Sequence, residues 1–151
     1  MTGYDSRRFR WAVGAAALLV GCTPASSASV ARGMGALRPT CGPADEPGVL
    51  LEVPVSAAAF PQFRLRVDGT VGDLIGRHYE VRGAEGETAF ADWCGDASDC
   101  RPVPGAVTTA AFGPMTADTS VAVRVRSTAP GGEPFAWSGV ARWHGQTMMC
   151  G

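Results

Sequence analysis

Hydrophobic and polar residues alternate along two segments in the first half of the chain. Between residues 49 and 55 hydrophobic side chains occupy every second position, and between residues 63 and 67 they alternate with charged ones. A period of two places each set of side chains on its own face of a strand, so both segments predict half-buried β-strands. Weaker alternation predicts three more strands, at residues 77–82, 88–93 and 106–112.

The clearest pair of predicted strands lies near the end of the sequence. Residues 121–126 carry valine at every second position, and residues 135–143 place Phe135, Trp137 and Trp143 on one face. A Pro-Gly-Gly turn within the intervening segment separates the two runs. This pattern predicts a β-hairpin.

The whole pattern indicates an all-β protein. Turns rich in glycine, proline and aspartate separate the predicted strands, and at most one helical turn is expected, at residues 72–76. We therefore predict a single antiparallel β-sandwich of about seven strands. Residues 121–126, the following turn and Trp137-Ser138 resemble the last two strands of fibronectin type III domains, which implies an immunoglobulin-like architecture. That family usually has tyrosine where Val121 stands, so the superfamily stays open.

The N-terminus has the three parts of a secretory signal. An apolar run at residues 11–20 follows arginines at positions 7, 8 and 10, and it ends in Leu19-Val20-Gly21-Cys22. This ending resembles the lipobox of bacterial lipoproteins. The resemblance implies cleavage before Cys22 and attachment of diacylglycerol to its sulfur. The run is shorter than the about 20 residues that a membrane-spanning helix needs, so we interpret it as a removed leader.

Three regions follow from this interpretation. Residues 1–21 are the lipoprotein signal peptide, residues 22–40 are a lipidated flexible tether rich in Ser, Ala, Gly and Pro, and residues 41–151 are the β-sandwich domain. The predicted location is the cell envelope, with the lipid bilayer as a partner through the N-terminal anchor. Thr23 stands where aspartate commonly signals retention at the inner membrane, which favours the outer membrane in a Gram-negative organism.

Four cysteines remain after Cys22, and an even number in an exported protein predicts two disulfides. Four cysteines allow three pairings. We favour Cys41 with Cys150, because these two bracket the domain and the ends of domains often lie close together. Cys94 then pairs with Cys100 around a short loop.

Charge excludes one class of partner. The domain has eight arginines, no lysine and thirteen acidic residues, for a formal charge of 8 − 13 = −5. A nucleic-acid-binding domain would carry a basic surface, so no nucleic acid is predicted. The arginine pairs Arg64/Arg66 and Arg124/Arg126 have strand spacing and are interpreted as solvated faces.

Two clusters are candidate metal sites. His144, Met148 and Met149 lie next to Cys150, and soft sulfur ligands suit copper, although the order of ligands differs from that of cupredoxins. We interpret this cluster as core packing beside a disulfide. The carboxylates that could bind calcium surround the predicted 94–100 loop, where solvated turn residues are the simpler interpretation; they are Asp92, Asp96 and Asp99. No metal or cofactor is predicted.

Catalytic motifs are missing from the sequence. It contains neither Gly-x-Ser-x-Gly nor His-Glu-x-x-His, and only His78 and His144 could act as a base near neutral pH. Ser138 lies in a predicted strand, where a nucleophile turn is not expected. No catalytic residue is therefore predicted.

Aromatic residues offer the best argument for binding. Trp93, beside Cys94, and Tyr79 are the candidate ligand-binding residues, because exposed aromatic faces stack on ligands. The predicted function is a non-catalytic binding or structural lipoprotein of the cell envelope, with an envelope protein or a glycan as partner. The alternative is a small exported carrier of copper or calcium, or a small enzyme.

Overall fold

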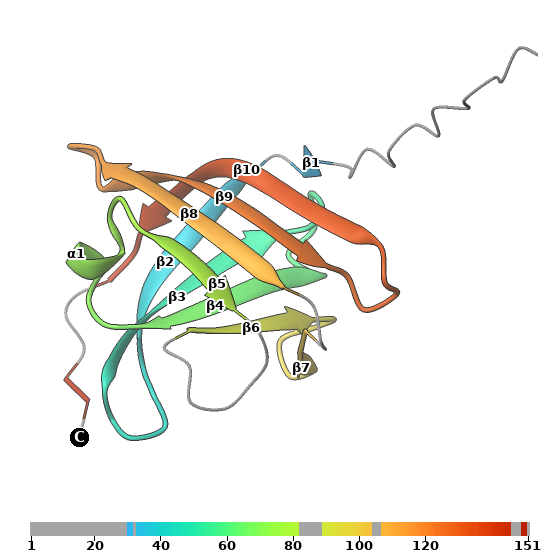
Figure 1. Cartoon of the computed structure of the whole chain (residues 1–151), viewed down its shortest axis with the longest axis horizontal. Coiled ribbons are helices and arrows are strands. Elements are labelled where there is room, and N and C mark those ends of the chain that lie inside the picture. Colours follow the sequence, from blue (N-terminus) through green and yellow to red (C-terminus); the bar gives the residue numbers. More distant parts are fainter. Residues whose placement is uncertain (1–29, 32, 82–88, 104–106, 146–148, 151) are drawn as a thin grey trace, which may run out of the picture.

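A computed structural model describes residues 30–31, 33–81, 89–103, 107–145 and 149–150. These residues form ten strands and one short helix (Figure 1). The elements are β1 (Val30–Ala31), β2 (Met34–Cys41), β3 (Pro47–Pro54), β4 (Gln62–Asp68), α1 (Val71–Leu74), β5 (His78–Val81), β6 (Ala89–Cys94), β7 (Cys100–Pro102), β8 (Thr108–Met115), β9 (Ser120–Thr128) and β10 (Pro134–Trp143).

The strands belong to one mixed sheet with the order β5-β8-β9-β10-β2-β3-β4-β6-β7. Neighbours along this path are antiparallel except β10 and β2, which run parallel, and β1 also pairs with β10 in parallel. The sheet curls, so that β8, β9 and β10 lie across β2, β3 and β4 (Figure 1). Curling also brings β5 close to β6, although these two strands are not paired.

Side chains that alternate in the sequence fill the inside of this curl. The inner positions of β3, β4 and β9 are almost completely buried, as are Phe135 and Trp137 on β10. Phe63 on β4 contacts Phe135 across the interior, with ring centroids 5.5 Å apart. Burying such a side chain stabilises the fold by roughly 1.5–3 kcal/mol. The predicted inward faces of these four strands are therefore confirmed.

The all-β class is confirmed, but an antiparallel sandwich of seven strands is not. All seven predicted strands are present with shifted ends, while β1, β2 and β7 were not predicted. They join the others in one curled sheet with parallel neighbours. Alternation predicts which side chains of a strand are buried, but it does not predict which strand lies beside it.

The predicted tether contains one clear error. Residues 34–40 were assigned to a flexible segment, but they form most of β2, between β10 and β3. Leu37 is fully buried there. Gly35 is buried beneath Trp137: a Cβ at residue 35 would lie 3.3 Å from the Trp137 ring. A glycine that suggested a linker thus lies in a tightly packed part of the fold.

A single helical turn, α1, overlaps the segment where the sequence allowed one turn at most. Thr70 precedes α1, and both its backbone N–H and its hydroxyl donate to one carboxylate oxygen of Asp73, at 2.8 and 2.7 Å. These hydrogen bonds hold the pKa of Asp73 below its ordinary value. Leu74 on the same turn is buried against the core. The helix therefore covers part of the apolar interior.

Both predicted disulfides are confirmed. Cys41, at the end of β2, is bonded to Cys150, with Cα atoms 5.7 Å apart. Cys94, at the end of β6, is bonded to Cys100, which lies directly opposite it on β7. The first bond ties the end of β2 to Cys150, near the C-terminus, and the second closes one hairpin.

The predicted signal peptide at residues 1–21 and the predicted lipidation site Cys22 lie outside the described residues. Within the described part of the chain, no helix has both the length and the apolar character needed to cross a membrane.

Candidate functional site

A hollow of about 330 Å³ lies where the β6–β7 hairpin faces the turn between β9 and β10. We call it the Trp93 hollow. Its lining residues come from the hairpin and, in the case of Pro130, from the turn; they are Trp93, Gly95, Asp99, Arg101, Pro102 and Pro130. The volume falls at the lower end of the range of small-molecule sites, which is about 300–1,000 Å³.

Trp93 is held in position by the core. It lies opposite Phe63 on β4 and opposite Arg101 on β7. Its ring stands almost perpendicular to Phe135, at an interplanar angle of 88° and with centroids 5.3 Å apart. The side chain is half-buried, so one part of the indole is anchored and another part borders the hollow.

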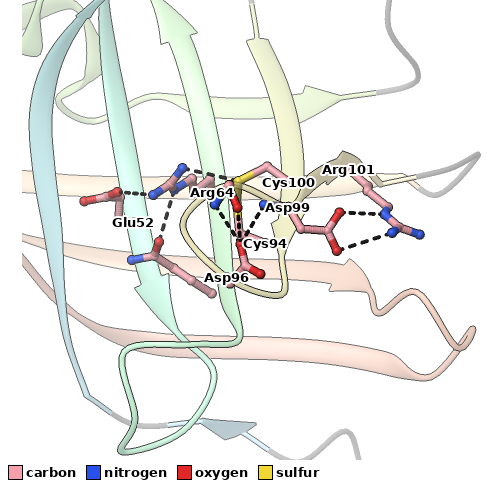
Figure 2. The surroundings of a disulfide bond; sticks show 9 residues. Glu52, Arg64, Cys94, Asp96, Asp99, Cys100 and Arg101 are labelled. Atoms are coloured by element: carbon pink, nitrogen blue, oxygen red, sulfur yellow. Dashed lines mark hydrogen bonds and ion pairs between the residues drawn. A yellow bond between two sulfur atoms is a disulfide. The ribbon is translucent and has the colours of Figure 1, made fainter.

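The loop of the hairpin is ordered by its own hydrogen bonds (Figure 2). One carboxylate oxygen of Asp96 accepts from the backbone N–H and hydroxyl of Ser98, at 2.7 and 2.9 Å, and from the N–H of Asp99, at 2.8 Å. Gly95 donates to the carbonyl of Asp99, at 2.9 Å. These donors lower the pKa of Asp96, because they stabilise the ionised carboxylate. The disulfide and this turn together fix the wall of the hollow.

A charged pair borders the same hollow. The Nε and Nη2 atoms of Arg101 donate to the two carboxylate oxygens of Asp99, at 2.9 and 3.3 Å. The pair raises the pKa of Arg101. The Arg101 side chain is 78% exposed, so both groups remain accessible from solvent. The hollow thus offers a hydrogen-bond donor and an acceptor beside an aromatic ring.

Arg64 supports the back of the hairpin (Figure 2). Its guanidinium contacts the Sγ of Cys100 at 3.3 Å, Gln62 at 3.0 Å and Glu52 at 3.1 Å. Arg66 lies over the ring of Phe90, 4.4 Å from its centroid.

Arg64 and Arg66 were predicted to be solvated, but their side chains are only 24% and 19% exposed. The prediction was wrong for this pair, because neighbouring strands cover both stems. Arg124 and Arg126 are exposed, as predicted.

Tyr79, the other candidate ligand-binding residue, does not line the Trp93 hollow. Its ring packs edge-on against Phe112, with centroids 5.8 Å apart, and its hydroxyl is 3.4 Å from the carbonyl oxygen of Asp73. Burial raises the pKa of Tyr79. Tyr79 therefore packs on the core beside α1.

The candidate copper ligands do not converge. Cys150 is in a disulfide, Met149 is 94% exposed, and Met148 lies outside the described residues. His144 is exposed to solvent, and its backbone N–H donates to the carbonyl of Leu37, at 2.7 Å.

The three candidate calcium ligands also have different partners and different surroundings. Asp96 orders the turn and Asp99 pairs with Arg101, whereas Asp92 is half-buried on β6. Burial raises the pKa of Asp92, and the positive charges of Arg64 and Arg66 oppose this effect. Among the described residues, no group of three His, Cys, Asp or Glu side chains is placed to hold a metal ion.

Trp93 was predicted from the sequence, whereas Arg101, Pro102 and Pro130 were not. Pro130 lies 37 positions from Trp93 and meets it only through the curl of the sheet. The two-residue spacing of Asp99 and Arg101 was an available signal, since such residues share a side of an extended segment. His78 and Ser138, weighed for catalysis, line a different hollow, together with Arg124.

No protein-family model matches the chain, and neither a curated protein nor a solved structure is significantly similar to it.

Proposed function

We propose that this protein is a lipid-anchored, non-catalytic binding module of the bacterial cell envelope, and that it holds a neutral saccharide in the Trp93 hollow. The observation that carries the proposal is the arrangement of Trp93 beside the Asp99–Arg101 pair, within a hairpin closed by a disulfide.

Cysteine usage supports export and anchoring. The sequence has five cysteines, and four of them are used in the two disulfides. Stable disulfides are typical of oxidising compartments outside the cytoplasm. Cys22, the fifth, occupies the position that the lipobox resemblance assigns to the lipid. Two or three acyl chains anchor a protein stably, because each buried methylene contributes about 0.8 kcal/mol.

The chemistry of the hollow favours a saccharide over an ion. A pyranose ring presents C–H groups on its faces and hydroxyls at its edge, which match an aromatic surface with polar groups beside it. Asp99 can accept from a hydroxyl and Arg101 can donate to one. Because the two charges balance each other, the hollow has no net charge that would select an ionic ligand.

Titration with oligosaccharides tests the binding proposal. We expect β-1,4-linked oligomers of glucose or N-acetylglucosamine to shift tryptophan fluorescence in a saturable way. Arg101→Ala, an exposed change, removes one charge-assisted hydrogen bond and lowers affinity about tenfold. Trp93→Phe removes part of the aromatic surface while retaining a ring against Phe135, and it should also weaken binding.

Trp143→Phe is the matched control, because Trp143 is half-buried and borders a separate hollow beside Pro39 and Val71. Binding that survives Arg101→Ala and Trp93→Phe unchanged, or that Trp143→Phe abolishes equally, contradicts the proposed site. Failure of all these saccharides to bind would overturn the saccharide as ligand.

Mass spectrometry and fractionation test the anchor separately. The mature protein should begin at Cys22 and carry acyl chains, and Cys22→Ser should move it from the membrane fraction to the soluble fraction. Equal membrane retention of the Cys22→Ser protein would contradict a lipid anchor at this residue.

A further inference from the structure

A second hollow, of about 370 Å³, lies on the outer side of the sheet, over β5, β8, β9 and β10. We call it the His78 hollow. The polar side chains that line it belong to His78, Arg124 and Ser138, all of which are exposed.

The register of the sheet places these three residues in one row. His78 is opposite Ala111, Ala111 is opposite Arg124, and Arg124 is opposite Ser138. Adjacent strands lie about 4.8 Å apart, so across the strands Arg124 is about 5 Å from Ser138 and about 10 Å from His78. Ala111 occupies the position between the two basic residues and leaves space above itself.

A β-bulge forms the floor beside this row. The pairing of β8 with β9 shifts between Phe112 and Met115, so that two residues of β8 face Ala122 alone. Gly113 lies in the bulge, and a Cβ there would come within 3.4 Å of the Ala122 side chain. Bulges commonly occur beside functional sites, where they redirect a strand. The hollow thus has small residues at its floor, namely Ala111, Gly113 and Ala122, beside the three polar side chains.

The lining has the chemistry of an oxyanion site. Arginine provides a planar fork of donors, and serine and histidine each provide a further donor. The lining residues include no carboxylate. In the next row, Glu80 and Arg126 flank Thr109 and carry opposite charges. The positive character therefore concentrates at Arg124.

We propose that the His78 hollow binds the phosphate group of a phosphate ester. A phosphate offers more acceptor oxygens than a carboxylate, which suits a row of several donors, and charge-assisted hydrogen bonds from arginine are the strongest of these. This inference rests on the register and charge of the outer row and does not depend on the saccharide proposal.

The test uses residues 23–151, so that neither the apolar leader nor a lipid anchor can carry the protein to membranes. Inorganic phosphate and glycerol phosphate are titrated by calorimetry, and vesicles of phosphatidylglycerol are compared with vesicles of phosphatidylcholine by sedimentation. Binding of the soluble phosphates identifies a phosphate site open to free ligands. Binding only to phosphatidylglycerol vesicles identifies the lipid headgroup as the source of the phosphate.

The variants separate a site from general electrostatics. Arg124→Gln should weaken binding at least about tenfold, which is typical for loss of a hydrogen bond to a charged group. Arg126→Gln is the matched control: it makes the same charge change at an exposed residue of the same strand, in the next row, and should change affinity less than about twofold. Ser138→Ala leaves the charge unchanged and should lower affinity several-fold.

Equal losses for Arg124→Gln and Arg126→Gln would overturn the proposal in favour of diffuse charge attraction. An unchanged affinity in Arg124→Gln, or no binding to any of the four probes, would overturn it as well. Circular dichroism of each variant verifies the fold, and all three substitutions lie on the outer face.

Discussion

The two disulfides of this protein restrain different parts of the molecule. Cys41 and Cys150 are 109 residues apart in sequence, whereas Cys94 and Cys100 are only 6 apart. The long-range bond ties β2, in the middle of the sheet, to the C-terminal end of the chain. The short-range bond restrains one turn whose residues line the Trp93 hollow. The long-range bond therefore restrains the whole fold, whereas the short-range bond restrains one wall of the Trp93 hollow.

Removing the long-range bond should have the largest effect on stability. In the chain-entropy model, a closed loop of about 100 residues stabilises the folded state by about 4.7 kcal/mol. The double variant Cys41→Ser/Cys150→Ser should therefore lose about 4–5 kcal/mol of unfolding free energy, measured by urea denaturation without reductant. A loss no greater than that of the short-range pair would contradict the comparison.

Removing the short-range bond should cost less stability but more binding. The same relation gives about 2 kcal/mol for a loop of six residues. Cys94→Ser/Cys100→Ser should weaken saccharide binding, because Gly95 and Asp99 lose the bond that holds their turn. The long-range double variant is the control at a temperature where both proteins are folded. Unchanged affinity in the short-range variant would mean that the turn keeps its shape through hydrogen bonds alone.

Asp96 provides a smaller test of the same turn. Its folded pKa lies below the ordinary value of 3.8, so the ionised carboxylate stabilises the fold above that pH, and this contribution is lost as the pH falls through the folded pKa. Asp96→Ala should be less stable than the wild type at pH 7. Denaturation across a pH series should show the difference shrinking below the ordinary carboxyl pKa. A difference independent of pH would exclude the carboxylate charge as its cause.

The smallest effect on stability is expected at Asp92, on the outer face of β6. Burial raises its pKa above 3.8, so ionised Asp92 disfavours folding at neutral pH, and the penalty disappears as the pH falls through the raised pKa and below 3.8. Asp92→Asn should be slightly more stable than the wild type at pH 7, with no advantage at low pH. Lower stability of Asp92→Asn at pH 7 would show that attraction to Arg64 and Arg66 exceeds the cost of burial.

Several features were predictable because they depend on local chemistry. Alternation marked the inner faces of β3, β4, β9 and β10, since burial of one face imposes a period of two on any strand. An even number of cysteines, two of them at the ends of the predicted domain, favoured the pairing that the structure has. Trp93 stood out as a candidate because it lies beside Cys94.

Local sequence patterns were thus sufficient to predict the all-β class and the buried faces and to favour one of three cysteine pairings, but they did not indicate which strands are neighbours. β2 has a linker-like composition, yet it pairs with β10, and its Gly35 fits closely beneath Trp137. The Trp93 hollow and the row of His78, Arg124 and Ser138 likewise join residues that are distant in sequence. This is because the side-chain period is a property of one strand, while register and curl arise from the hydrogen-bond ladders between strands.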